Sequence, residues 1–121
     1  MPRKVHATKL SSTAKAVVRS GTTVTGSTLY TVPAGKTLVI TGCWLALVAS
    51  GVGNGTLQLQ APSEDTGSNQ NLLALTVPIS TGAAHRMTEC EVRVPAAGVI
   101  SGVGTNLAVA NYGFSGYLES A

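Results

Sequence analysis

The sequence has little charge and few aromatic residues. Of its 121 residues, 11% are charged and 4% are aromatic, whereas about a quarter of a typical soluble domain is charged. Its hydrophobic content of 44% excludes a disordered chain, which combines low hydrophobicity with high charge. A lone monomer with so few charges would expose an unusually apolar surface coated with Thr, Ser and Gly. The composition therefore favours a protein whose surface is largely buried in an assembly.

The residues and motifs of several functional classes are missing as well. There are two histidines, His6 and His85, and no CxxC motif, so we expect neither a metal site nor a metal enzyme of the cupin type. There is no Gly-x-Ser-x-Gly elbow and no phosphate-binding loop. No apolar run reaches the ~18 residues of a membrane span, and no secretory signal follows the basic start. We therefore expect no catalytic residues, no cofactor and no membrane association.

Two acidic residues are the best candidates for acid and base chemistry. Glu89 and Glu91 lie two apart on a predicted strand at 85–94, which separates them by about 7 Å on one face. Arg93 shares this face, so a solvated and self-neutralising strand face is the favoured interpretation. His85 is expected to be exposed at the start of the strand. The opposite, inward face is predicted to carry Thr88, Cys90, Val92 and Val94.

The two cysteines, Cys43 and Cys90, each lie in an apolar strand pattern. This setting favours two buried, reduced thiols, because a buried cysteine behaves as a small hydrophobic residue. A disulfide between them is the alternative, and it would need an oxidising compartment.

Positive charge is concentrated at the N-terminus. Residues 1–20 hold five basic residues and no acidic one, a net charge of +5, whereas residues 21–121 hold three basic against five acidic residues, a net charge of −2. Apart from a strand candidate at 16–19, the segment has no clear periodicity. We predict an extended basic arm at 1–20 that contacts a partner protein; the alternative is an arm folded back along its own domain. The arm has no aromatic residue to stack on bases, which favours a protein partner over nucleic acid. The predicted contact residues are Arg3, Lys4, Lys9, Lys15 and Arg19.

Residues 21–121 have the pattern of an all-β domain. Strand segments recur with turn signals every ~8–12 residues, which is typical of an antiparallel sandwich of about eight strands. The segments are 22–25, 28–32, 37–49, 56–61, 70–80, 85–94, 99–103, 107–110 and 112–119. Two corners resemble each other, since Thr31–Gly35 (TVPAG) and Arg93–Gly98 (RVPAAG) each precede an apolar strand. Proline ends the hydrogen-bond ladder and glycine permits the reversal, and two such corners favour a jelly roll of two Greek keys.

The longest apolar run, Leu29–Ala49, holds the only tryptophan, Trp44. Alternation between apolar and polar residues is weak up to Thr41 and then stops, so we expect both faces of the strand at 37–49 to be covered. One face should fill the sandwich and the other should meet a sister subunit. Residue parity leaves open whether the subunit face is that of Trp44 or that of Cys43 to Leu47. The predicted interface residues are Cys43, Trp44, Leu45 and Leu47.

A resemblance to a known family lies in two segments, TVPAGKTLVITG (Thr31–Gly42) and FSGYLES (Phe114–Ser120). They resemble the first corner and the last strand of small jelly-roll virion proteins of tailed bacteriophages, which include capsid decoration (cement) proteins and fibre tips. The resemblance implies a homotrimer on the outer capsid surface that clamps the major capsid protein and assembles in the host cytoplasm. The alternative is a fibre-tip module that recognises a cell-surface glycan. The predicted loops at 51–55, 62–69 and 81–84 contain no aromatic residue to stack on a sugar.

Overall fold

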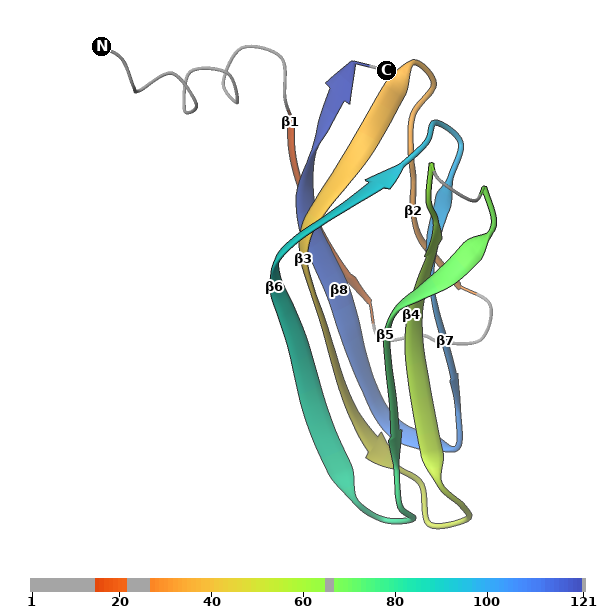
Figure 1. Ribbon diagram of the computed structural model, residues 1–121. Coiled ribbons are helices and arrows are strands. Elements are labelled where there is room, and N and C mark those ends of the chain that lie inside the picture. Colours follow the sequence, from red (N-terminus) through yellow and green to blue (C-terminus); the bar gives the residue numbers. More distant parts are fainter. Residues whose placement is uncertain (1–14, 22–26, 65–66, 121) are drawn as a thin grey trace, which may run out of the picture.

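The protein folds entirely from β-strands. A computed structural model describes residues 15–21, 27–64 and 67–120, and within them the chain forms eight strands (Figure 1). The strands are β1 (Lys15–Gly21), β2 (Ser27–Thr31), β3 (Lys36–Ala49), β4 (Gly55–Pro62), β5 (Asn69–Val77), β6 (Gly82–Val94), β7 (Val99–Thr105) and β8 (Leu107–Ser120). The described part of the chain holds no helix long and apolar enough to cross a membrane.

The strands form two four-stranded antiparallel sheets that face each other. Sheet A has the order β1-β8-β3-β6 and sheet B the order β2-β7-β4-β5 (Figure 1). Except for β4 and β5, consecutive strands lie in opposite sheets, so the chain winds around the core as two interlocked Greek keys. This order is that of a jelly roll, and the predicted fold class is confirmed.

Several strand boundaries differ from the predicted ones: β5 (Asn69–Val77) ends earlier than the predicted 70–80, β6 begins earlier, at Gly82, and the largest differences concern β1 and β8. β1 begins at Lys15, inside the segment predicted as an arm, and it pairs along its length with β8, from Lys15 opposite Leu118 to Gly21 opposite Tyr112. The predicted segments at 107–110 and 112–119 form one continuous strand, β8. The predicted segment at 22–25 lies outside the described residues.

The two predicted corners are equivalent turns that lie against each other. In the first, the N–H of Lys36 donates to the carbonyl of Pro33 at 3.3 Å; in the second, the N–H of Gly98 donates to Pro95 at 3.0 Å. Val32 joins the corners, because its N–H donates to the Gly98 carbonyl and its own carbonyl accepts from the N–H of Ala97, both at 2.9 Å. The corners therefore tie the β2–β3 and β6–β7 connections together at one end of the sandwich.

Aromatic residues fill the centre of the core. Tyr112 and Phe114 on β8 are 1% and 0% exposed, and the ring of Tyr30 packs against Phe114 with centroids 5.8 Å apart. Gly102 on β7 lies against the Tyr112 ring so closely that a Cβ there would overlap it. This glycine lets sheet B approach the largest side chain that sheet A buries.

A bulge interrupts the pairing of β3 with both of its neighbours at Thr41. Ile40 pairs with Val92 and Gly42 pairs with Thr88, so one residue of β3 stands opposite the three residues 89–91 of β6. Before the bulge, Leu38 and Ile40 point into the core, whereas after it Cys43 and every second residue that follows do so. The core-facing positions of β3 therefore shift by one residue at Thr41.

Candidate interaction surfaces

The bulge decides which face of β3 fills the core. Cys43, Leu45 and Leu47 are 1%, 1% and 2% exposed and belong to the core of a single chain, so they cannot meet a sister subunit. The prediction of these three residues as a subunit interface was wrong. Strict alternation from Leu38 would put Trp44 on the inner face, but the bulge at Thr41 exchanges the two faces of the strand beyond it. Of the four predicted interface residues, Trp44 alone lies on the outer face, and it is half-buried.

The outer face of sheet A is apolar below the bulge. Trp44, Ala46 and Val48 alternate with the core residues of β3, and cross-strand partners on β6 and β8 share their face. The partners on β6 are Arg86, Ala84 and Gly82, and those on β8 are Gly113, Asn111 and Val109. Arg86 is the one charged residue among them. We call Trp44, Ala46, Val48, Ala84 and Val109 the apolar face.

The apolar face continues into one end of the sandwich, at the bottom of Figure 1, where three connections meet. The N–H of Ser50 donates to the carbonyl of Asn106 at 2.7 Å, and its carbonyl accepts from the N–H of Ser80 at 3.3 Å. The side chain of Asn106 also donates to the carbonyl of Asn54 at 3.3 Å. We call these connections, residues 50–54, 78–81 and 106, the apolar end.

Large aliphatic side chains are exposed at this end. Val52 is 81% exposed and Ile79 47%, and the adjoining Val109 and Val48 are 53% and 40% exposed. The sequence has no Asp, Glu, Lys or Arg in 37–63, 66–85 or 94–118, the stretches that supply the apolar end. An exposed aliphatic surface without charge, held by backbone hydrogen bonds, is typical of a surface that packs against a protein partner.

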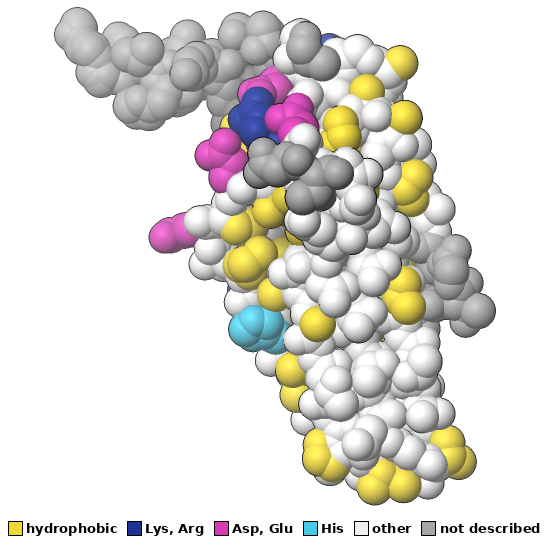
Figure 2. All heavy atoms as spheres, turned by 45° about the vertical axis from the view of Figure 1, so that its right-hand side comes forward, with side chains coloured by type: hydrophobic (Ala, Val, Ile, Leu, Met, Phe, Trp, Pro, Cys, Tyr) yellow, Lys and Arg dark blue, Asp and Glu magenta, His cyan; other side chains and the backbone are white. Residues whose placement is uncertain are grey.

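Charge gathers at the opposite end. Figure 2 shows acidic side chains grouped around a basic one near the top of the molecule, whereas hydrophobic side chains are spread over the visible face, down to the bottom. Arg93 on β6 forms ion pairs with Glu64 at 3.5 Å, Glu91 at 3.2 Å and Glu119. The buried Thr37 hydroxyl donates to Glu64 at 3.4 Å, and the Glu64 N–H donates to the Arg93 carbonyl at 3.0 Å. Arg93 thereby links β6, β8 and the β4–β5 connection.

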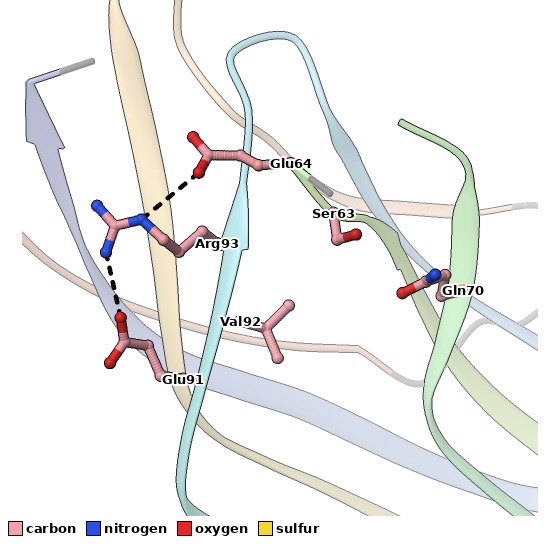
Figure 3. A pocket seen from close by; sticks show the side chains of 6 residues that line it. All are labelled: Ser63, Glu64, Gln70, Glu91, Val92 and Arg93. Carbon is pink, nitrogen blue, oxygen red and sulfur yellow. Dashed lines mark hydrogen bonds and ion pairs between the residues drawn. The ribbon is translucent and has the colours of Figure 1, made fainter. Parts of the chain in front are cut away.

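A hollow of about 300 Å³ lies beside Arg93, between β6 and the β4–β5 connection. Its lining residues are Ser63, Glu64, Gln70, Glu91, Val92 and Arg93 (Figure 3). The carboxylates of Glu64 and Glu91 both point to the guanidinium of Arg93, so the charges that line the hollow largely neutralise one another. The lining includes no histidine, lysine or cysteine.

The two acidic residues predicted to share a face, Glu89 and Glu91, both lie in the bulge and are both exposed. Glu89 has a positive φ of 57° and is exposed, whereas Glu91 binds Arg93, as the favoured interpretation has it. The bulge also corrects the predicted inward face of β6. Thr88 is exposed and Met87 packs against the core, whereas Cys90, Val92 and Val94 point inward as predicted. His85 is exposed, as expected.

The two cysteines are free thiols that lie together. Burial of Cys43, and after it the neighbouring Cys90 thiol, raises the pKa of Cys43 from 9.0 to about 12. Within the described residues there is no cluster of three or more His, Cys, Asp and Glu that could hold a metal ion.

The predicted arm residues fall in two groups. Arg3, Lys4 and Lys9 lie outside the described residues, whereas Lys15 and Arg19 belong to β1. Lys15 pairs with Leu118, next to Glu119 in the chain, so β1 begins at the charged end of the sandwich.

No protein-family model matches the chain, and no curated protein matches its sequence. Among solved structures, Eiger TNF from S. frugiperda is similar at 9% identity and a TM-score of 0.45, over 90% of this chain and 93% of that one. A protein of the disulfide-linked pili that form Bacillus endospore appendages is 12% identical, with a TM-score of 0.38 over 88% of this chain and 86% of that one. The top component of cowpea mosaic virus, a naturally occurring empty particle, is 9% identical, with a TM-score of 0.36 over 92% of this chain and 77% of that one. At TM-scores below 0.5, these likenesses carry no conclusion about the role of this chain.

Proposed function

We propose that this protein is a structural virion protein, a capsid decoration (cement) protein that sits as a homotrimer on the outer surface of a bacteriophage capsid. The apolar end, together with the apolar face, is the observation that carries the proposal. It is a rigid, uncharged and exposed aliphatic surface, and it adjoins sheet A without a break. Burial of such a surface against another protein is favourable because it releases water from apolar groups, and it does not incur the free-energy cost of removing water from charged groups.

A sister subunit is the partner that suits this surface. Near a three-fold axis the equivalent residues of the three copies approach one another, so any charge there meets its own copies, which costs free energy. The apolar end contains no charged residue, and Arg86 is the one charge bordering the apolar face. Three copies can therefore pack here around a common axis without electrostatic repulsion.

The charged end and the arm are proposed to face the capsid. β1, the first described strand, begins at that end, opposite the proposed trimer contact. Its five basic residues, Arg3, Lys4, Lys9, Lys15 and Arg19, suit acidic patches on the major capsid protein.

The trimer is tested by measuring the mass of the purified full-length protein by light scattering and sedimentation. We expect a trimer for the wild type and a folded monomer for Val109→Asp and Val52→Asp, whose side chains are exposed and whose substitution spares the core. Val99→Asp is the matched control, because Val99 is 36% exposed but lies at the opposite end, after the second corner. A monomeric wild type, or trimers of both apolar-end variants, would overturn the proposed contact.

Capsid binding is tested by adding the protein to capsids of the source virus that lack it. Deletion of residues 2–14 keeps all of β1 and should preserve the trimer while weakening binding at least tenfold. Removal of residues 1–20 would also delete most of β1, so it would confound binding with folding. Undiminished binding by the shorter protein would contradict a role of the arm in capsid attachment.

A further inference from the structure

The bulge in sheet A brings two sulfur atoms together. β6 has three residues, 89–91, where β3 has only Thr41, so Cys90 sits at a break in the ladder between the Ile40–Val92 and Gly42–Thr88 pairs. A bulge of this kind leaves its extra residues unpaired and redirects their side chains. The Cys90 thiol consequently points inward, donates to the carbonyl of Ile40 at 3.7 Å and packs against the core.

Cys43 meets it from the adjacent strand. Its side chain is 1% exposed and belongs to the same core cluster that Cys90 packs against, just below the bulge. Both residues are free thiols, and Cys90 is the more accessible of the two, since it is half-buried. Two neighbouring thiols on the inward side of adjacent strands, one of them reachable from solvent, form a site for oxidation to a disulfide.

We propose that Cys43 and Cys90 form an intramolecular disulfide when the folded protein meets a small disulfide oxidant such as oxidised glutathione. The thiolate of Cys90 attacks one sulfur of the oxidant, a mixed disulfide forms, and the first glutathione leaves as a thiol. Cys43 gives its proton to solvent and attacks Sγ of Cys90, and the second glutathione leaves. Two protein thiols are thereby oxidised to one disulfide while the oxidant is reduced to two thiols.

The crosslink would strengthen the sandwich where its ladder is weakest. Of the described strands, β6 pairs with β3 alone, and the bulge interrupts that pairing midway. A bond from Cys43 to Cys90 spans the interruption and closes a long loop of the chain, which limits the freedom of the unfolded state. A particle protein released from a reducing cell into an oxidising medium would gain stability in this way. The inference does not depend on the proposed capsid role, since it concerns a single chain.

The test is oxidation of the native full-length protein by oxidised glutathione at pH 8, followed by intact mass and peptide mapping. We expect a product lighter than the reduced protein by two hydrogen atoms, with tryptic peptide Thr37–Arg86 joined to Met87–Arg93. We also expect a urea midpoint above that of the reduced form, restored by dithiothreitol. Formation should be slow and should accelerate about tenfold per pH unit between pH 7 and 9, because buried Cys43 must lose its proton first.

Two variants separate the steps. Cys43→Ala should stop at a glutathione adduct on Cys90, and Cys90→Ala should stay unmodified because Cys43 is shielded from solvent. A wild type that accumulates only the Cys90 adduct, that stays reduced or that forms disulfide-linked dimers would overturn the proposal. An intramolecular product with an unchanged or lower urea midpoint would overturn its stabilising role.

Discussion

Ala97 occupies in the second corner of the sandwich the position that Gly35 occupies in the first. Each is the third residue of a turn that a proline opens, and their φ angles are 68° and 76°. A type II turn needs a positive φ at this position, which glycine adopts freely and alanine adopts at a cost. The two corners therefore share one geometry, and only the first has the residue that suits it.

We therefore predict that Ala97→Gly stabilises the protein. Glycine removes the strain of the positive φ in the folded state, and this gain should exceed the loss caused by the greater conformational freedom of the unfolded chain. The expected net increase in the free energy of unfolding is up to about 1 kcal/mol. Urea unfolding followed by circular dichroism measures it. Ala96→Gly is the control, because Ala96 is equally exposed but has no positive φ, and it should be neutral or destabilising. A loss of stability in Ala97→Gly would show that the corner does not strain alanine.

The corners also show how far the sequence could predict the fold. Pro33 and Pro95 end strands and Gly35 and Gly98 follow them, so local chemistry predicts two equivalent reversals and the jelly roll that fits them. The bulge at Thr41 has no comparable signal, because it is produced by pairing with β6 and β8, strands far away in the sequence. A shift of one residue exchanges the faces of a strand. For this reason Cys43, Leu45 and Leu47 were predicted at an interface and lie in the core.

The assignment of faces leads to a second prediction, on adjacent residues of β3. Leu45→Ala should lower the free energy of unfolding by about 2–5 kcal/mol, because it leaves a cavity around a side chain that is 1% exposed. Trp44→Ala should cost less than half as much, since the half-buried indole lies outside the core. Both are best measured in the Val109→Asp background, which removes the proposed subunit contact from the comparison. A larger loss for Trp44→Ala would contradict the reversal of faces at Thr41.

The charged end was only partly predictable. Alternation along one strand places Glu91 and Arg93 on the same face. The other two partners of Arg93 are Glu64 and Glu119, which lie 27 and 28 residues from Glu91 in the sequence, and only the tertiary fold brings them to Arg93. No sequence period relates such distant positions. Similarly, the apolar end is assembled from three connections, each of which is unremarkable on its own.

A third prediction concerns Arg93. Arg93→Ala leaves three carboxylates close together without their cation and should lower the free energy of unfolding by about 1 kcal/mol at low salt. The loss should shrink in 1 M NaCl, because added ions screen the repulsion among partly exposed groups. Arg86→Ala is the control on the same strand, since Arg86 forms no ion pair within the described part of the chain. Equal losses at low and high salt would indicate that Arg93 acts through packing.

The last prediction concerns the alkaline stability of the reduced protein. The folded protein holds the Cys43 proton up to about pH 12, whereas the unfolded chain releases it near pH 9.0. The free energy of unfolding is therefore unaffected by this thiol below pH 9, and it falls as the pH rises from 9 toward 12, by at most about 1.4 kcal/mol per pH unit.

The variant Cys43→Ala lacks the thiol and hence this pH dependence, and it should be less stable than the wild type at pH 8 because of the cavity it creates. Urea unfolding of both proteins from pH 8 to 11, with a reductant present, should show the difference between them narrowing steadily. All other titratable groups are common to the two proteins and cancel in the comparison. Parallel curves would mean that the Cys43 thiol ionises as readily in the core as in the unfolded chain, which its burial and its contact with Cys90 oppose.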